Sequence, residues 1–367
     1  MHKNTGRKIL VVLPWSAYGT AGVERFTQSL VDNLDAKYLH ITVVVIAPRS
    51  LSRDMITKAF ATHVSVEILY ADHARHSILR LARLITNIKP DRIVSNVAHI
   101  CITTLIAKYI VFSRARCISV QHSFEPNTRF LLYAIIIGIF SYRVVVVSEA
   151  IKLYYKKYIR CVVHKVIVIP NGFDLDLIKK KAREHISADD QNIFSEKRTL
   201  VSVSRLESEK NITFLLQAFA SIPKEHLCNT QLLIIGDGDQ RLMLESLARS
   251  LEIVSVVHFL GWKDNPYPYI AQSDMLVVSS DFEGFGRVLV EAMALGVPVV
   301  STDCPGGPRE ILDNGAYGIL VPLGDSDAMV DAIITTLERQ HDRERLMSYA
   351  KQFSSEKTVQ AFARLLI

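Results

Sequence analysis

The chain alternates short apolar runs rich in β-branched residues with longer helical stretches, and this alternation limits it to α/β folds. In the first half, the apolar runs begin at residues 8, 40, 65, 91, 116, 143 and 165; a second series begins at residues 199, 231, 256, 275, 298 and 318. Nearly continuous apolar strands are typical of parallel sheets that helices cover on both faces. The pattern therefore predicts two doubly wound, Rossmann-like α/β domains.

A polar stretch between residues 171 and 197 interrupts the alternation. It suggests an N-terminal domain over 1–175, a linker over 176–197 and a C-terminal domain over 198–350. The final residues, 351–367, are expected to form a helix that packs back on the N-terminal domain. Because ligands of doubly wound folds bind beyond the carboxyl ends of the strands, the two domains are expected to face a central cleft.

Charge is distributed unevenly along the chain. Residues 1–180 carry 25 Lys and Arg against 11 Asp and Glu, whereas the remainder carries 18 against 26. A basic half joined to an acidic half suggests different partners for the two domains. The basic half could face anionic lipid or phosphorylated ligands. The sequence has no recognised DNA- or RNA-binding module, so nucleic acid is not an expected partner.

Glycines mark two of the loops that follow predicted strands. Gly19 and Gly22 follow the first strand, and a helix that begins at Gly22 could hold a phosphate at its N-terminus. Gly236 follows a strand of the second domain and could let a base or a phosphate approach the backbone. A tight turn explains all three glycines equally well, so this signal alone is weak.

Two cations follow the first strand of the second domain. Arg205 ends that strand, and Lys210 lies just before a helix whose expected N-cap is Asn211. Cations at a strand end beside a helix start suit a diphosphate. Solvated surface charges are the alternative interpretation.

The most specific pattern is a pair of glutamates eight positions apart, Glu283 and Glu291. Glu283 lies in a predicted loop, where it can accept hydrogen bonds from hydroxyl groups. Glu291 falls in a predicted helix from about residue 287 to 295, among apolar neighbours, where a carboxylate is costly unless it is paired or bound to a ligand. Vicinal ribose hydroxyls match a carboxylate that accepts two hydrogen bonds, and a buried pair with a nearby Arg or Lys is the alternative. The loop between the glutamates can approach a phosphate through Gly284, Phe285 and Gly286.

Taken in order, these motifs resemble the family-4 retaining glycosyltransferases of the GT-B fold over nearly the whole chain. The resemblance rests on "GTAGVERF", "QH" at 121–122, "VVVVSEA", "IPNGFD", "SRLESEKN", "IIGDGDQR", the Glu-x7-Glu pair and "GILVPLGD". The stretch "STDCPGGPREIL" also resembles bacterial members that build surface polysaccharides or lipid-linked oligosaccharides. The first loop reads Gly-Thr-Ala-Gly where many members have adjacent glycines.

The resemblance implies a nucleotide-sugar donor, and it favours uridine as the nucleoside because uridine is usual in this family. Arg205 and Lys210 would hold its diphosphate, helped by backbone amides near Gly22 and Val288. Glu291 would bind the ribose hydroxyls. The remaining donor-binding positions implied by the motifs are Gly236, Gly284, Phe285 and Gly286.

Glu283 would contact hydroxyls of the transferred sugar, and His122 and Gly19 would line the acceptor side. For His122, a hydrogen-bonded histidine at a strand end is the alternative. The catalytic set that the resemblance implies is His122, Arg205, Lys210 and Glu283. Fixed cations and helix N-termini would stabilise the departing diphosphate. Neither glutamate is left over as a covalent nucleophile, so attack from the leaving-group face is expected. No suitable DxD motif is present, so a metal-independent enzyme without a cofactor is expected.

Membrane contact is a separate expectation. The stretch from Lys152 to Arg160 interleaves basic and tyrosine residues, which suits an anionic interface. The apolar run 130–140 is either a core helix or a second contact. Together with the basic half, these stretches favour a polyprenyl-diphosphate or glycan acceptor and a cytoplasmic protein on the inner face of the cell membrane. A sugar-nucleotide epimerase or hydrolase, or a sugar-binding protein without chemistry, remains the alternative function.

Overall fold

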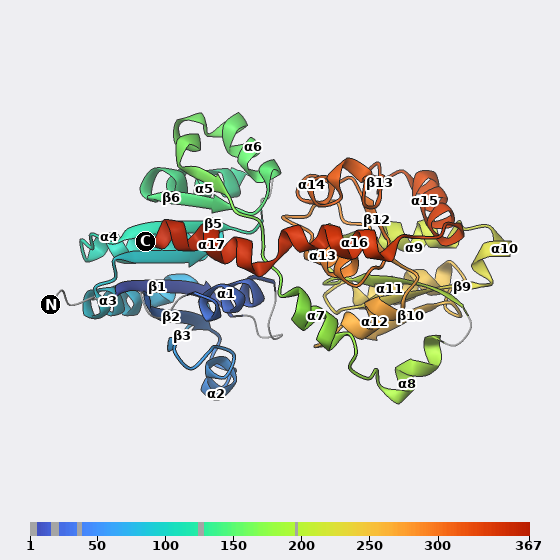
Figure 1. Cartoon of the computed structure of the whole chain (residues 1–367), viewed down its shortest axis with the longest axis horizontal. Helices are drawn as coiled ribbons and strands as arrows, with labels where there is room; N and C mark the ends of the chain where they lie inside the picture. The colour runs from blue at the N-terminus through green and yellow to red at the C-terminus, as the bar shows by residue number, and fades with distance from the viewer. Residues whose placement is uncertain (1–5, 16–21, 35–38, 124–127, 195–196) are drawn as a thin grey trace. The chain divides into compact units, whose positions relative to one another are not determined.

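A computed structural model describes residues 6–15, 22–34, 39–123, 128–194 and 197–367. The chain forms two compact units, and each unit contains one parallel sheet with helices on its faces (Figure 1). Unit 1 comprises residues 1–173 and 353–367, and unit 2 comprises residues 174–352. The expected α/β class with two doubly wound domains is confirmed.

Unit 1 contains, within the described residues, a seven-stranded sheet in the order β3-β2-β1-β4-β5-β6-β7. Its strands are β1 (Arg7–Pro14), β2 (Leu39–Ala47), β3 (Ser65–Tyr70), β4 (Arg92–Asn96), β5 (Arg116–Gln121), β6 (Arg143–Val146) and β7 (Val166–Val168). Its helices are α1 (Gly22–Asp32), α2 (Arg53–Thr57), α3 (Ile78–Ile88), α4 (Ala98–Ile110), α5 (Thr128–Phe140), α6 (Glu149–Tyr158) and α17 (Ser355–Leu366). The strand order reverses between β1 and β4, which makes this the switch point where doubly wound folds bind ligands.

Unit 2 contains a six-stranded sheet in the order β10-β9-β8-β11-β12-β13 within the same described part of the chain. Its strands are β8 (Arg198–Val203), β9 (Thr230–Ile235), β10 (Val257–Gly261), β11 (Met275–Val278), β12 (Val299–Thr302) and β13 (Ile319–Val321). Its helices are α7 (Leu175–Lys181), α8 (Ala188–Gln191), α9 (Ile212–Ala220), α10 (Lys224–Leu227), α11 (Arg241–Ser250), α12 (Tyr267–Gln272), α13 (Arg287–Ala294), α14 (Pro308–Ile311), α15 (Ser326–Glu338) and α16 (Arg343–Ala350). Its switch point lies between β8 and β11, which pair in parallel at Met275 and Leu200.

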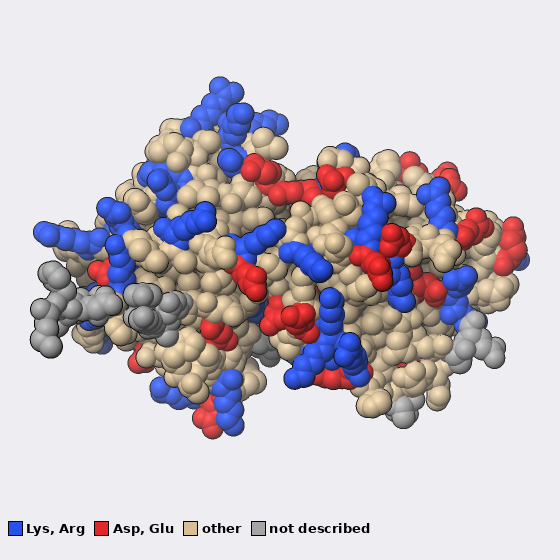
Figure 2. Space-filling model, viewed as in Figure 1, with Lys and Arg blue, Asp and Glu red and all other residues tan. Residues whose placement is uncertain are grey.

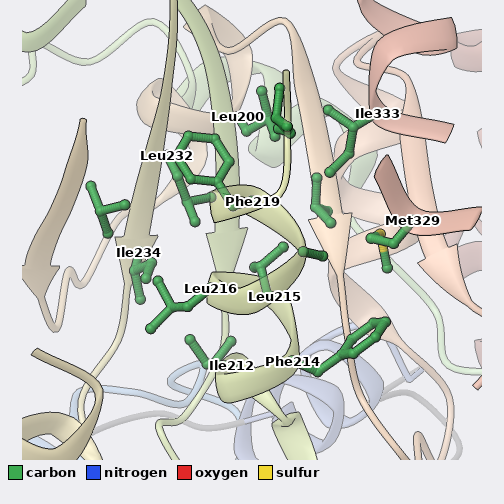
Figure 3. Packing of buried hydrophobic residues seen from close by; sticks show 14 of the residues in the cluster. Leu200, Ile212, Phe214, Leu215, Leu216, Phe219, Leu232, Ile234, Met329 and Ile333 are labelled. Carbon is green, nitrogen blue, oxygen red and sulfur yellow. The ribbon is translucent and has the colours of Figure 1, made fainter. Parts of the chain in front are cut away.

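Helix α9 anchors the core of unit 2. Its apolar side chains, including Leu215 and Phe219, are fully buried between strand residues such as Leu232 and the α15 residues Met329 and Ile333 (Figure 3). Asn211 caps this helix as expected, since its side chain accepts a hydrogen bond from the amide of Phe214. The packing fixes the start of α9, and with it the loop that carries Lys210.

Residues 176–197, expected as a linker, differ from that expectation. Their described part folds into α7 and α8 within unit 2. Ile178 of α7 is buried, and the Asp190 carboxylate forms a 2.6 Å ion pair with Lys263. The polar composition hid these tertiary contacts.

Helix α17 belongs to unit 1. Phe362 of α17 packs edge-on against Phe26 of α1 with ring centroids 5.8 Å apart, and Leu366 joins the same core. Phe173 and Phe353 are the residues at which the chain leaves unit 1 and returns to it. They are hydrogen-bonded, since the amide of Phe173 donates to the carbonyl of Phe353 at 2.9 Å. The last segment is therefore part of the unit that the first residues build.

The apolar run 130–140 forms most of α5 and is partly buried. Phe130, Ala134 and Ile137 face the interior, whereas Leu132, Ile139 and Phe140 are exposed. No helix in the described ranges combines the length and apolar composition that a membrane span requires.

Candidate functional site

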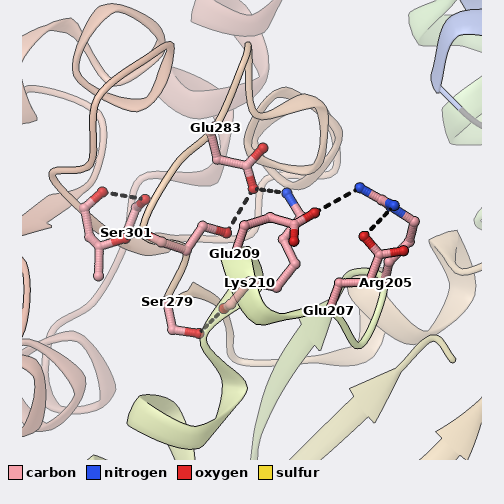
Figure 4. Close-up of polar contacts among 9 residues, drawn as sticks. Arg205, Glu207, Glu209, Lys210, Ser279, Glu283 and Ser301 are labelled. Carbon is pink, nitrogen blue, oxygen red and sulfur yellow. Dashed lines mark hydrogen bonds and ion pairs between the residues drawn. The ribbon is translucent and has the colours of Figure 1, made fainter. Parts of the chain in front are cut away.

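The carboxyl ends of β8 and β11 bring two predicted site residues together in unit 2. Lys210 lies in the loop after β8, and Glu283 lies in the loop after β11. Since adjacent parallel strands end at the same edge of a sheet, these loops meet at the switch point. The Lys210 ammonium lies 2.7 Å from Oε1 of Glu283 (Figure 4).

This ion pair is shielded and held at both ends. The Lys210 and Glu283 side chains are 15% and 14% exposed. The Ser280 hydroxyl donates to the same Oε1 of Glu283 at 2.8 Å, and the Ser279 hydroxyl donates to the Lys210 carbonyl at 2.9 Å. A lysine ammonium has three N–H donors, and Glu283 engages one of them. The arrangement can therefore offer a fixed positive charge and a fixed acceptor to one ligand.

Arg205 lies on the same loop but has other partners. Its side chain is 56% exposed, and its guanidinium forms ion pairs with Glu207 and, at 2.9 Å, with Glu209. Burial, followed by the neighbouring Glu209 carboxyl, raises the pKa of Glu207. Arg205 is thus surrounded by carboxylates, and a bound diphosphate would have to compete with them.

The loop that carries Glu283 is fastened to a Gly-Gly step that sequence analysis did not assign to the site. The Glu283 amide donates to the Pro305 carbonyl, and the Gly307 amide donates to the Glu283 carbonyl, both at 3.2 Å. A Cβ on Gly306 would lie 1.5 Å from the Glu283 carbonyl oxygen, and one on Gly307 would lie 1.9 Å from that of Phe285. Two adjacent glycines in the sequence "PGGP" indicate a close backbone approach, but they do not identify the segment that is approached.

The predicted helix after this loop is α13, and its bounds are confirmed to within a residue. Gly286 is its N-cap with φ of 93°, a conformation that favours glycine. Val288 lies in the first turn, where amide groups lack partners within the helix. Phe285 is buried, so its side chain anchors the loop between Gly284 and Gly286.

Glu291 is buried in α13, with its side chain 8% exposed. Its carboxylate lies 3.9 Å from a guanidinium nitrogen of Arg287, one turn earlier. That separation satisfies an ion pair but exceeds hydrogen-bond range. Arg287 is thus the nearby cation that the alternative interpretation, a buried ion pair, requires. Binding of ribose hydroxyls by Glu291 stays a prediction. Among the described residues, no hydrogen bond or ion pair links Glu291 to the Lys210–Glu283 pair.

Gly236 has a packing reason for its identity. Its φ is 138°, and a Cβ there would lie 1.8 Å from the carbonyl oxygen of Ser204. The turn after β9 therefore closes directly onto the end of β8. This contact explains the glycine without a ligand, and a donor-binding role for it stays a prediction.

In unit 1, His122 and Asn96 meet at the carboxyl ends of β5 and β4. Nε2 of His122 lies 3.0 Å from Oδ1 of Asn96, and its ring packs edge-on against Phe26 at 4.9 Å. The Asn96 amide donates to the Val12 carbonyl at 3.4 Å, which turns Oδ1 toward the histidine. Nε2 is then the ring nitrogen that carries the proton toward Asn96. Asn96 was not predictable from the sequence, because a single asparagine at a strand end has no spacing signal.

The backbone beside this pair is strained. Val97 follows Asn96 and has φ of 65°, which is rare for a β-branched residue. Such strain is concentrated at functional sites. Gly22 begins α1 beside the same sheet edge, and Gly19 lies outside the described residues.

Asn96→Asp should raise the pH at which the His122 ring protonates by about one unit or more, because a carboxylate beside the ring favours its charged form. Histidine NMR titration of the folded variant measures this midpoint. Asn33→Asp makes the same charge change at an exposed position of unit 1 and should leave the midpoint unchanged. Equal midpoints in both variants would mean that Asn96 does not set the state of His122.

Two family models match successive parts of the chain. The model for Glycosyltransferase Family 4 matches residues 20–177, and the model for Glycosyl transferases group 1 matches residues 184–353. Both units are therefore matched in chain order.

Curated relatives agree with these matches. An uncharacterized glycosyltransferase of Methanocaldococcus jannaschii is 27% identical over 340 residues, which cover 78% of this chain and 82% of the relative. The N-acetylgalactosamine-N,N'-diacetylbacillosaminyl-diphospho-undecaprenol 4-alpha-N-acetylgalactosaminyltransferase of Campylobacter jejuni is 33% identical over 184 residues, 50% of this chain and 47% of that protein.

Solved structures share the fold over almost the whole chain. Anabaena HepE in complex with UDP-glucose has a TM-score of 0.80 at 22% identity and covers 98% of this chain and 99% of that one. The lipopolysaccharide outer core galactosyltransferase WaaB has a TM-score of 0.72 at 18% identity, covering 97% and 98%. At these identities the likeness shows the fold alone.

Proposed function

The chain belongs to the family-4, or group 1, glycosyltransferases with the GT-B fold, and on that premise we propose that it is a retaining hexosyltransferase that uses a UDP-sugar donor. The acceptor in this proposal is a lipid-linked or polysaccharide glycan of the cell surface. The observation that carries it is the shielded Lys210–Glu283 pair at the switch point of unit 2. The UDP-glucose of the HepE complex and the diphospho-undecaprenol in the name of the Campylobacter relative support the choice of donor and acceptor.

The chemistry follows from where charge develops. Cleavage of the bond between sugar and phosphate places negative charge on the departing diphosphate. Lys210, with the N-terminus of α13, would stabilise that charge more than the charge of the bound donor, which accelerates the reaction. Glu283, fixed by Ser280, would accept hydrogen bonds from hydroxyls of the sugar. We assign no covalent nucleophile, so the acceptor would attack from the face that the diphosphate leaves, and a diphosphate oxygen would take its proton.

In this proposal the diphosphate is neutralised by protein groups, so activity needs no divalent ion. His122, with its proton on Nε2, would line the acceptor side in unit 1. The basic excess of residues 1–180 and the exposed Lys156, Lys157 and Tyr158 of α6 support contact between unit 1 and the cytoplasmic membrane surface.

A donor screen tests the function. The full chain is incubated with a panel of nucleotide-sugars, and the released nucleoside diphosphate is measured with and without a polyprenyl-diphosphate acceptor, each with and without EDTA. We expect release that depends on the acceptor and survives EDTA. Equal release without an acceptor would indicate a hydrolase, and loss of activity in EDTA would overturn the metal-independent clamp.

Glu291→Ala should weaken the binding of free uridine diphosphate by about 10- to 150-fold. The basis is that a hydrogen bond to a charged group contributes about 1.5 to 3 kcal/mol. Calorimetric titration measures the affinity, and Glu338→Ala, at an exposed position of α15, is the matched control. A folded Glu291→Ala variant with wild-type affinity would leave Glu291 with a structural role beside Arg287.

A further inference from the structure

Unit 1 has a cavity at the amino-terminal edge of its sheet, the edge opposite the strand ends that carry Asn96 and His122. Its volume is about 760 Å³. The first residues of β1, β4 and β5 line it, together with the end of α3 and the loop between α4 and β5. Strands of a parallel sheet begin at the same edge, so this cavity is separate from the candidate site.

The cavity is strongly basic. Arg7, Lys89, Arg92, Arg114 and Arg116 line it, and Asp91 is the one acidic residue among its lining side chains. One oxygen of the Asp91 carboxylate accepts a hydrogen bond from the Lys8 amide at 2.9 Å. Within the described part of the chain, none of the five cations forms an ion pair. Five positive charges thus share one concave surface with a single carboxylate among them.

Arg92 shows the cost of this arrangement. Its Nε is buried and has no hydrogen-bond partner among the described residues. Burial, followed by the positive charges of Arg7 and Arg116, lowers the pKa of Arg92. Arg116 is itself held in place, since its guanidinium lies 4.6 Å from the ring centre of Tyr142 and donates to the tyrosine hydroxyl at 3.3 Å. The fold therefore holds like charges together although they repel one another.

Exposed apolar side chains adjoin the basic cavity. Phe112 is 90% exposed, and it lies between two residues that line the cavity, Val111 and Ser113. Its φ is 49°, an uncommon conformation for a bulky residue. Ile110 and Tyr109, at the end of α4, are about half exposed. Lys and Arg also predominate over acidic residues on the visible face of unit 1 (Figure 2).

We propose that the basic cavity binds a phosphate group. Clustered guanidinium groups match phosphate oxygens in charge and geometry, and a bound phosphate would give the Arg92 Nε an acceptor. A phospholipid headgroup and a soluble phosphoester share this chemistry. The exposed Phe112 favours the headgroup, because an aromatic side chain beside cations can enter the interface of an anionic membrane. The site does not depend on glycosyl transfer.

The first experiment measures whether phosphate protects the arginines of the cavity from chemical modification. Arginines of the full chain are modified with phenylglyoxal, with and without inorganic phosphate, and peptide mass spectrometry follows each position separately. Phosphate should slow modification of Arg92 and Arg116 several-fold and leave the exposed Arg53 of α2 unchanged. Site-resolved reading separates this cavity from the donor site. If millimolar phosphate changes the modification rate at none of the three positions, the proposal is wrong.

The second experiment measures sedimentation with vesicles of phosphatidylcholine and phosphatidylglycerol. The double variant Arg92→Gln with Arg116→Gln should bind about 25-fold more weakly, the factor that two cations near an anionic surface contribute. Arg53→Gln with Lys58→Gln removes the same charge from exposed positions at the start of α2 and just after its end, and should bind as the wild type does. Equal loss in both double variants would mean that only net charge matters, and would overturn a phospholipid site at the cavity.

Phe112→Asn separates the two sources of phosphate. Asparagine tolerates the backbone conformation of this position, so the variant should fold. If it weakens vesicle binding while phosphate still protects Arg92 and Arg116, the site takes a lipid headgroup. If phosphate protects both arginines but wild type and all variants bind vesicles equally, the site takes a soluble phosphoester. A variant with the α6 charges removed, Lys152→Gln, Lys156→Gln, Lys157→Gln and Arg160→Gln, measures the share of vesicle binding that α6 contributes.

Discussion

Lys210→Ala is expected to lower kcat by about 10- to 1000-fold while the protein remains folded. Its ammonium is the shielded cation of the candidate donor site and should act most strongly as the diphosphate departs. The change also leaves the Glu283 carboxylate, 14% exposed, without its partner, so some loss of stability is expected too. Steady-state kinetics and thermal unfolding are measured on the same preparation.

Lys263→Ala is the matched control for this prediction. Lys263 and Asp190 form a comparably shielded ion pair in unit 2, at 2.6 Å, with side chains 25% and 14% exposed. Its loss should lower stability by a similar amount and leave kcat close to the wild-type value. If the two variants lose activity in parallel with stability, Lys210 is a structural residue and the proposed diphosphate clamp is wrong.

Gly306→Ala should destabilise unit 2 by about 3 kcal/mol or more. The positive φ of 127° strains any L side chain, and the new Cβ would lie 1.5 Å from the carbonyl oxygen of Glu283. The backbone of the Glu283 loop must then move, so activity should fall together with stability. Chemical denaturation measures the free energy of unfolding, and uridine diphosphate titration reports on the donor site.

Gly315→Ala separates the two causes of that loss. Gly315 also has a positive φ, 98°, but a Cβ there would meet no atom within 4 Å. This variant should show only the conformational cost, about 1 to 2 kcal/mol, and should keep its activity. Equal losses in the two variants would show that the contact between Gly306 and Glu283 is unimportant.

The sequence predicts features that depend on local pattern. Apolar β-branched runs specified both sheets, and the glycines around Phe285 with the stop at Gly296 located α13 to within a residue. Features that depend on pairs far apart in the chain were not predictable. Nothing local indicates that Lys210 would pair with Glu283, or that Gly306 would close onto the Glu283 backbone.

Specific contacts also changed two other interpretations made from the sequence. The guanidinium of Arg205, which the resemblance assigns to the donor diphosphate, forms ion pairs with Glu207 and Glu209. Both glutamates lie within four positions of it. Residues 176–197 read as a linker because their polar side chains dominate, yet one buried apolar residue, Ile178, and the Asp190 ion pair attach them to unit 2. In each case a few specific contacts outweigh the average composition.

The return of α17 to unit 1 has a consequence for biosynthesis. The core of unit 1 includes Phe362 and Leu366, which the ribosome adds after every residue of unit 2. Unit 2 is continuous in the chain, whereas the core of unit 1 lacks part of its apolar packing until α17 has been added. The unit whose synthesis begins first is thus the unit that receives its last core residues at the end of synthesis.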